Sequence, residues 1–231
     1  MSGFFSTISR LRWIQRWSLK RNTLKETVME HSWEVGVIAH ILGCINNQLF
    51  GGNINADRLS TLALYHDCAE AITGDLPTPI KYYSKDIERA YKAIEKDAED
   101  SLVAMLPKEL QERFRPLICG NGISEDEKKF LKAADNLSAY IKAKAELANG
   151  NEEYILTVNN LEEQIEECGL REVDYFLEVF LQTKQKSHEE LLAAKNQRVA
   201  GVPIDFRGMS HLDIIKTLRA PRTDTNKVSN F

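Results

Sequence analysis

The chain has 231 residues, enough for one domain with a substantial hydrophobic core and room for a second small unit. Hydrophobic residues make up 43% and charged residues 28%, which is ordinary for a soluble globular protein. The net charge is −4: residues 195–231 hold seven Lys or Arg and three Asp, which gives that segment +4 and leaves −8 on the rest. An acidic body argues against a nucleic-acid polymer as the main partner.

The predicted secondary structure is helical almost throughout. Apolar residues at positions 4, 5, 8, 11 and 14 predict a first helix over 4–14. Helices over 30–48 and 56–73 follow, and Gly74 ends the second of them. Pro77 and Pro79 then predict an extended segment.

The second half of the chain continues the helical pattern. A long amphipathic helix is predicted over 85–106 and a short one over 107–114. Ser124 and Glu127 form a predicted capping box at the start of a helix that continues to 148. Further helices are predicted over 151–167, 172–184 and 188–194. No segment alternates with a period of two for long enough to predict a sheet, so the fold class is all-α.

The predicted domain organisation is a helical domain over 1–194 and a basic extension over 195–231. Glycines and prolines loosen the composition after Lys195, and we expect the extension to be partly mobile. No apolar stretch approaches the roughly 20 residues of a membrane span, so no membrane association is expected. The start of the chain lacks a basic segment followed by an apolar one, so we expect a cytoplasmic protein whose four cysteines are reduced.

Candidate metal ligands are the most informative residues of the chain: His31, His66, Asp67 and Asp135. Imidazole nitrogens and carboxylate oxygens together suit a divalent transition metal. His66 and Asp67 lie side by side in an apolar stretch, where burial is costly unless a partner such as a cation compensates. Three antiparallel helices can bring such side chains to one point in a bundle core. Each residue alone also fits a plainer interpretation, as a packed core histidine or an ordinary paired carboxylate.

The order of these residues and of the motifs around them resembles the HD superfamily of metal-dependent phosphohydrolases. Within it, the chain resembles the bacterial YfbR-like 5′-deoxynucleotidases over roughly residues 3 to 190. The matching motifs are Arg16-Trp17, Glu30-His31-Ser32, Tyr65-His66-Asp67, Glu70, the loop TGDLPTP from Thr73 to Pro79, and Ala134-Asp135.

The resemblance implies an all-α HD-domain helical bundle with a central metal site held by His31, His66, Asp67 and Asp135. It also implies hydrolysis of deoxyribonucleoside 5′-monophosphates to deoxynucleoside and phosphate, by direct attack of metal-bound water. One divalent ion is expected. The family favours Co²⁺ or Mn²⁺, and the ligand types are also compatible with Fe²⁺ or Zn²⁺. A homodimer is expected by resemblance alone.

Glu70 and Asp75 are the predicted catalytic residues. Glu70 lies one turn from His66 and is expected to supply the proton for the leaving 5′ oxygen, although a solvated or ion-paired carboxylate is the alternative. Asp75 is expected either to orient the attacking water or to bind the sugar 3′-hydroxyl, and the sequence leaves both open. The family places Leu76, Pro77 and Thr78 against the substrate beside Asp75, and a rigid helix connector is the plainer interpretation of this loop.

The remaining predicted substrate-binding residues are Arg16 and Trp17, together with His31 and Asp67 from the metal site. Arg16 can grip a phosphate through two parallel hydrogen bonds. Trp17 can lie against the sugar and leave no room for a 2′-hydroxyl, a filter that requires a rigid wall. Without the family resemblance, a core tryptophan and a surface arginine would be the preferred interpretation of this pair.

Two alternatives to the predicted activity remain open at the level of sequence. HD proteins also hydrolyse cyclic nucleotides, nucleoside triphosphates and guanosine alarmones, and the lack of a second HD-type metal set weakens the cyclic phosphodiesterase reading. A non-catalytic nucleotide-binding module is the other alternative, against which the intact Glu70 argues.

Overall fold

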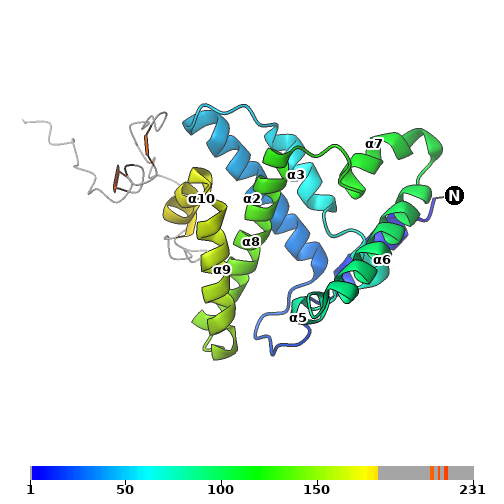
Figure 1. Cartoon of the computed structure of the whole chain (residues 1–231), viewed down its shortest axis with the longest axis horizontal. Coiled ribbons are helices and arrows are strands. Elements are labelled where there is room, and N and C mark those ends of the chain that lie inside the picture. Colours follow the sequence, from blue (N-terminus) through cyan, green and yellow to red (C-terminus); the bar gives the residue numbers. More distant parts are fainter. Residues whose placement is uncertain (1, 182–208, 211–212, 214–215, 218–231) are drawn as a thin grey trace, which may run out of the picture. The chain divides into compact units, whose positions relative to one another are not determined.

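A computed structural model describes residues 2–181, 209–210, 213 and 216–217 of the chain (Figure 1). Within these residues there is no strand, only an isolated antiparallel bridge between Gln15 and Thr27, which confirms the all-α prediction. No helix in this part of the chain is long and apolar enough to cross a membrane. The α-helices are α1 (Phe4–Ile8), α2 (Val28–Leu49), α3 (Ala56–Tyr65), α4 (Glu70–Thr73), α5 (Thr78–Lys81), α6 (Lys85–Ala104), α7 (Lys108–Ile118), α8 (Glu125–Ala148), α9 (Ile155–Cys168) and α10 (Arg171–Phe176). The 3₁₀ turns are η1 (Ser9–Trp13) and η2 (Glu152–Tyr154), and η3 (Leu177–Leu181) is a π-helical turn.

The chain forms two compact units, Met1–Cys44 with Ile54–Gly169, and Ile45–Asn53 with Leu170–Phe231. In the second unit, Asn46 Nδ2 donates to Glu172 Oε1 at 2.8 Å, and the Arg171 guanidinium lies 4.6 Å from the centre of the Phe50 ring. The predicted helix over 188–194, the last residues of the helix predicted over 172–184, and the predicted domain boundary at 194 lie outside the described residues. The basic extension lies almost wholly outside them too, so its proposed mobility stays a prediction.

Two long helices of the first unit begin with capping boxes, which satisfy the otherwise unpaired N–H groups of the first turn. At α2, Thr27 N–H donates to Glu30 Oε2 at 2.7 Å, and Glu30 N–H donates to Thr27 Oγ1 at 3.2 Å. At α8, the box predicted at Ser124 and Glu127 is confirmed. These two helices carry the predicted ligands His31 and Asp135, so the local sequence fixes where both helices begin.

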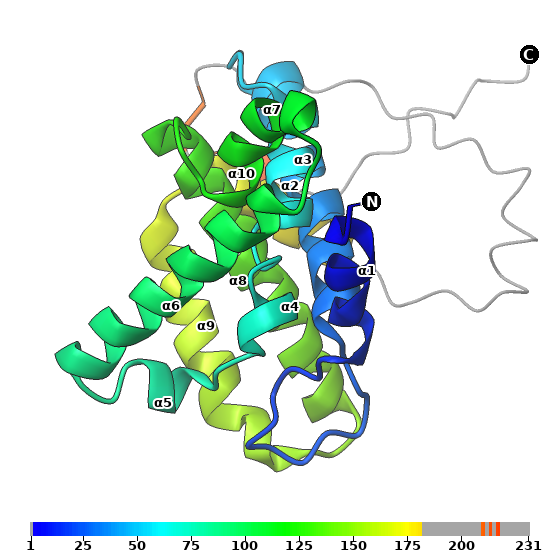
Figure 2. The same ribbon diagram turned by 90° about the vertical axis from the view of Figure 1, so that its right-hand side faces the viewer.

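The helices of the first unit pack through small residues and separate apolar clusters. Adding a Cβ to Gly43 of α2 would bring it within 2.8 Å of the Ala56 Cβ, so glycine permits the close approach of α2 and α3. Helix α8 packs against α3 and α9, and α6 packs against α4 and α7 (Figure 2). One buried cluster beneath α6 and α7 consists of Phe4, Cys68, Leu102, Val103, Leu106 and Ile118.

The prediction of one continuous helix over 56–73 is wrong in its middle. Helix α3 ends at Tyr65 and α4 begins at Glu70, and between them Cys68 N–H donates to the Tyr65 carbonyl oxygen at 3.1 Å in a tight turn. The cause is local: the His66 ring Nδ1 lies 2.6 Å from the Ala63 carbonyl oxygen, the acceptor that Asp67 N–H would use in a continuous helix. A side chain that takes a helical acceptor competes with the helical ladder.

Three other boundaries differ from the sequence prediction. The segment after Pro77 is not extended, because Pro77 precedes α5 and Pro79 lies in its first turn, where a missing N–H costs no helical hydrogen bond. Helix α7 continues past 114, through Pro116, to the buried Ile118. The predicted helix over 4–14 tightens into 3₁₀ geometry after Ile8.

Candidate metal centre

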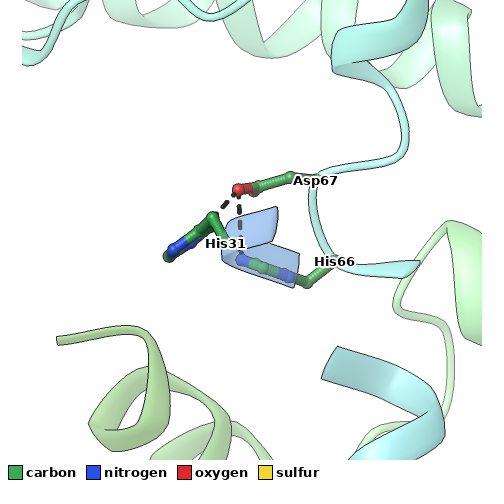
Figure 3. Close-up of side chains that lie close together, drawn as sticks. All are labelled: His31, His66 and Asp67. Carbon is green, nitrogen blue, oxygen red and sulfur yellow. Dashed lines mark ion pairs between the residues drawn. The ribbon is translucent and has the colours of Figure 1, made fainter. Parts of the chain in front are cut away.

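Three of the four predicted ligands meet at one point in the first unit, and the fourth, Asp135, contacts one of them. His31 lies in the first turn of α2, His66 and Asp67 in the turn between α3 and α4, and Asp135 in α8. One donor atom from each of His31, His66 and Asp67 lies within 4.8 Å of the other two. Figure 3 shows the Asp67 carboxylate facing both imidazoles, with Oδ2 3.1 Å from His66 Nε2 and 3.6 Å from His31 Nε2. Asp135 Oδ1 lies 3.2 Å from His31 Nε2.

The donor atoms of this cluster fit a divalent cation. Nε2 of His31 and Nε2 of His66 are buried, and neither makes a hydrogen bond to any residue in the described part of the chain. A buried polar atom without a partner is costly, and a cation bound to these nitrogens would remove that cost. Two imidazole nitrogens and two carboxylate oxygens are a ligand set that suits Zn²⁺, Mn²⁺, Fe²⁺ or Co²⁺.

The electrostatics of the cluster keep its carboxylates ionised. Burial opposes the charged form of each carboxylate, but His66 and His31 hold the pKa of Asp67 below its usual value. For Asp135, burial is likewise outweighed by His31, Lys132 and His66, and its pKa lies well below the usual range. Lys132 Nζ contacts Asp135 Oδ2 at 2.9 Å, so Oδ1 is the oxygen that faces His31. Conversely, although burial lowers it, the pKa of His66 rises to about 9 because Asp67 and Asp135 lie close by.

The backbone orients the His66 ring. Nδ1 lies 2.6 Å from the Ala63 carbonyl oxygen, which accepts the Nδ1 proton and leaves Nε2 as the ring nitrogen that faces Asp67. Hydrogen bonds of this kind fix the tautomer and the direction of metal-binding histidines. The same contact that ends the regular part of α3 therefore points Nε2 of His66 at Asp67.

Glu70 is the first residue of α4, at the edge of the cluster. Its Oε2 is buried and has no hydrogen-bond partner in the described part of the chain. Burial, with the neighbouring charges of Asp67 and Asp75, raises the pKa of Glu70 well above its usual value, while Arg16 and His66 oppose the rise. A carboxyl group in this setting is protonated at neutral pH. The expectation that Glu70 lies one helical turn after His66 is wrong, because the break between α3 and α4 separates the two residues.

Arg16 and Trp17 are held together by Glu26. Arg16 Nη1 and Trp17 Nε1 donate to the same oxygen, Glu26 Oε2, at 2.9 and 2.8 Å. The side chain of Arg16 is only 15% exposed, so the interpretation as a surface cation is wrong. Burial lowers the pKa of Arg16, but Glu26, Asp67 and Asp135 more than offset that effect, which places the guanidinium in the field of the cluster.

The indole of Trp17 is half-buried and fixed on two sides. It packs against the Tyr154 ring with centroids 5.5 Å apart, and its ring nitrogen is bound by Glu26. The backbone of Trp17 has φ of +60°, a left-handed conformation that costs a non-glycine residue roughly 1–2 kcal/mol. Strain of this kind persists only where surrounding contacts hold the residue in place.

Asp75 follows Gly74, whose φ of +74° turns the chain at the end of α4. Burial raises the pKa of Asp75, while Arg16 and His31 lower it and Asp67 raises it further, so this carboxylate shares the field of the cluster. Leu76 and Pro77 are half-buried, and Thr78 is exposed at the start of α5. Their contacts with a substrate stay predictions.

Three residues around the cluster were missed at the level of sequence: Glu26, Glu34 and Ser138. Glu34 is three residues after His31 and Ser138 is three residues after Asp135, so each lies on the same helix face as a ligand. That spacing could have identified both. Glu26 stands in an irregular segment between Arg16 and α2, where no pattern in the sequence distinguishes it.

Comparison with known proteins identifies a family. A family profile described as 5′-deoxynucleotidase YfbR-like matches residues 3–184. The 5′-deoxynucleotidase YfbR of Shigella boydii serotype 18 is 49% identical over 190 residues, which cover 82% of this chain and 96% of that protein. The 5′-deoxynucleotidase YfbR of Escherichia coli O127:H6 is 49% identical over the same shares of the two chains.

Solved structures show the same fold. An HD-domain phosphohydrolase from Listeria innocua superposes with a TM-score of 0.69 at 27% identity, covering 78% of this chain and 86% of that one. The HD phosphohydrolase of cyanophage S-2L, solved with dA and one catalytic Zn²⁺ ion, superposes with a TM-score of 0.57 at 20% identity. That superposition covers 78% of this chain and 96% of the cyanophage protein.

Proposed function

The chain belongs to the YfbR-like 5′-deoxynucleotidase family, and we propose that its His–Asp cluster is the centre at which it hydrolyses deoxyribonucleoside 5′-monophosphates. The protein is a phosphoric monoester hydrolase, as its relatives of 49% identity are. The observation that carries the location of the site is the meeting of His31, His66 and Asp67, with two buried ring nitrogens that face carboxylates and make no hydrogen bond to the described residues.

His31, His66, Asp67 and Asp135 are the residues that would hold one divalent cation. When bound there, such an ion polarises a phosphate oxygen and lowers the pKa of water in its coordination sphere. The two carboxylates contribute two negative charges, which balance a dication while the imidazoles stay neutral. His31 and Asp67 would also lie against the phosphate, because they form the centre of the cluster.

The proposed chemistry is a single in-line displacement at phosphorus. A water oxygen attacks phosphorus, the bond from phosphorus to the 5′ oxygen breaks, and no covalent bond to the protein forms. The 5′ oxygen leaves with the bonding electron pair and requires a proton. Glu70 is suited to donate it, because its carboxyl group is protonated at neutral pH and Oε2 has no other partner among the described residues.

Substrate recognition is proposed to rest on Arg16, Trp17 and the loop from Asp75 to Thr78. Arg16 is held by Glu26 close enough to Asp67 and Asp135 to feel their charges, and there it would contact the substrate phosphate. The indole of Trp17 is bound at Nε1 and packed on Tyr154, which makes it the rigid wall that exclusion of a 2′-hydroxyl requires. Asp75 would bind the sugar 3′-hydroxyl or orient the attacking water, and Leu76, Pro77 and Thr78 would line the pocket.

The identity of the ion, the oligomeric state and the location belong to the same proposal. We propose Co²⁺ or Mn²⁺ as the preferred ion, with Fe²⁺ or Zn²⁺ able to occupy the same nitrogen and oxygen donors. The cyanophage protein shows that an HD phosphohydrolase can hold a single catalytic Zn²⁺. A cytoplasmic homodimer is proposed by family resemblance.

The experiment that tests the proposal is phosphate release from metal-stripped protein after each divalent ion is added back. The panel comprises deoxyribonucleoside and ribonucleoside 5′-monophosphates, a deoxynucleoside triphosphate and a guanosine alarmone. The proposal predicts turnover of deoxyribonucleoside monophosphates that depends on the added ion. Preference for the triphosphate or the alarmone would show that the proposed substrate is wrong. The absence of turnover with every ion would favour a non-catalytic nucleotide-binding module.

A further inference from the structure

A hydrogen-bonded chain leads away from the metal centre on the far side of His31. His31 Nδ1 lies 3.1 Å from Ser138 Oγ, and the Ser138 hydroxyl donates to Glu34 Oε2 at 2.6 Å. His31 and Ser138 are fully buried, and Glu34 is partly buried. The chain joins α2 to α8, the two long helices that carry His31 and Asp135.

The direction of the protons in this chain follows from counting donors. Ser138 has one hydroxyl proton, and the short distance to Glu34 is typical of a hydroxyl that donates to an ionised carboxylate. The lone pairs of Ser138 Oγ are therefore left to accept, and among the described residues the partner on the other side is His31 Nδ1. Nδ1 of His31 must then carry a proton, and Nε2, which faces Asp67 and Asp135, is the nitrogen left to bind a cation.

We propose that Ser138 and Glu34 are positioning residues that hold His31 in the tautomer and orientation in which Nε2 binds the cation. The inference rests on the metal-dependent function proposed above and deepens it. It adds two residues that touch neither the ion nor the substrate and act only through His31. Partners of this kind raise the basicity of a metal-binding imidazole and typically change metal affinity by about 10–100-fold when removed.

The two histidines of the site are oriented by different partners. His66 donates to the backbone carbonyl of Ala63, which no substitution can remove. His31 depends on two side chains, the second of which can be ionised. The orientation of His31 can therefore be changed by substituting its partners, whereas that of His66 cannot.

Glu34 is a practical place to test the chain because it lies at the edge of an open groove. The groove has a volume of about 560 Å³, and its other lining residues include Glu26, Met29 and Trp33. Truncating Glu34 therefore enlarges an existing groove and leaves the core of the bundle intact. Ser138→Ala removes a single oxygen from a buried site and leaves the helix unchanged.

The first experiment measures Zn²⁺ affinity, by competition with a chelator, for the full-length protein without nucleotide. Ser138→Ala and Glu34→Ala are each expected to weaken Zn²⁺ binding by about 10–100-fold. The double variant is expected to lose no more than Ser138→Ala alone, because both residues act through one hydrogen bond to His31. Glu34→Gln, which keeps an acceptor for the Ser138 hydroxyl, should retain most of the affinity. Ser101→Ala and Glu163→Gln, at exposed positions, are the matched controls.

The second experiment observes His31 directly by nitrogen NMR of the Zn²⁺-bound protein. It is expected to show Zn²⁺ on Nε2 and a proton on Nδ1 that exchanges slowly with solvent, and Ser138→Ala should make that proton exchange fast. Zn²⁺ on Nδ1 of His31 would overturn the inference, as would unchanged affinity in either alanine variant or additive losses in the double variant. If the parent protein bound no Zn²⁺ at all, the proposed function would fail with it. If the parent protein bound Zn²⁺ and the alanine variants bound it equally well, only the positioning role of Ser138 and Glu34 would be lost.

Discussion

Glu146 offers the sharpest test of how the segment that carries Arg16 and Trp17 is held in place. This carboxylate in α8 is fully buried, and it accepts hydrogen bonds from Thr23 N–H at 2.9 Å and from Leu24 N–H at 2.9 Å. Asn151 Nδ2 donates to it at 2.8 Å, and the buried ammonium of Lys142 forms an ion pair with it. The segment between Trp17 and α2 is thus tied to α8 through Glu146 and through Lys142, which also donates to the Leu24 carbonyl oxygen.

The substitution Glu146→Gln keeps the size of the side chain and removes its charge. The Lys142 ammonium, whose side chain is 6% exposed, then has no ion-pair partner among the described residues and keeps only the Leu24 carbonyl oxygen as an acceptor there. Removing one member of a buried ion pair costs about 3–5 kcal/mol, because it leaves an uncompensated buried charge. In a chain of this size each kcal/mol lowers the melting temperature by about 2–4 °C. We therefore expect a loss of roughly 6–20 °C.

The assay is thermal and urea unfolding followed by circular dichroism, with Glu163→Gln on the exposed face of α9 as the control. The control should stay within about 0.5 kcal/mol of the parent protein. A loss below about 1 kcal/mol for Glu146→Gln would refute the reasoning, because the ion pair and its hydrogen bonds would then contribute no more than a surface contact.

The pH dependence of the same variant supplies a second check with a definite sign. Burial favours the neutral form of Glu146, but hydrogen bonds from Asn151, Lys142, Leu24 and Thr23 hold its pKa far below the usual range. A depressed pKa contributes stability that is present above the unfolded-state pKa, about 4.3, and is lost as pH falls through the folded-state pKa. The difference in unfolding free energy between the parent and Glu146→Gln should therefore be constant near neutral pH and shrink below about pH 4.

Three further substitutions test the proposed roles around the cluster. Glu70→Gln should lower kcat by about 10²–10⁴-fold while Zn²⁺ affinity is kept, and unchanged turnover would remove Glu70 from the reaction. In the parent protein, kcat should fall as pH rises through the pKa of Glu70, because the proposed acid must be protonated. Arg16→Ala should lower kcat/KM for a deoxyribonucleoside monophosphate by about 10–100-fold, whereas the exposed Arg12→Ala should leave it unchanged. Trp17→Ala should bring kcat/KM for ribose and deoxyribose substrates closer together, and an unchanged ratio would show that another wall excludes the 2′-hydroxyl.

The sequence was sufficient where structure follows from local chemistry. The capping box at Ser124, the apolar periodicity of α2 and α6, and the all-α class were all predicted correctly because each depends on residues within a few positions of one another. The candidate ligands were proposed for a different reason. Histidine and aspartate in an apolar setting are costly, and the order of these residues with the surrounding motifs resembles that of the HD phosphohydrolases.

The parts that the sequence did not predict depend on single contacts. The break between α3 and α4 arises because the His66 ring bonds to the Ala63 carbonyl oxygen. The spacing of apolar residues along the sequence does not indicate that contact. The role of Glu26 follows only from the structure, in which Arg16 and Trp17 donate to the same oxygen of its carboxylate. Glu34 and Ser138 had the correct helical spacing, but only their distances show which carboxylate and hydroxyl lie behind His31.

The most direct test of the central claim is a count of bound ions set against activity. Protein stripped with a chelator is titrated with Co²⁺, and at each point the metal content and the phosphate released from a deoxyribonucleoside 5′-monophosphate are measured together. One ion per chain is expected, with turnover rising in proportion to the occupancy of the metal site. Asp135→Asn should lower the metal content and the turnover together. Full turnover by protein without metal would contradict the account, as would activity that is independent of an intact His31, His66, Asp67 and Asp135 cluster.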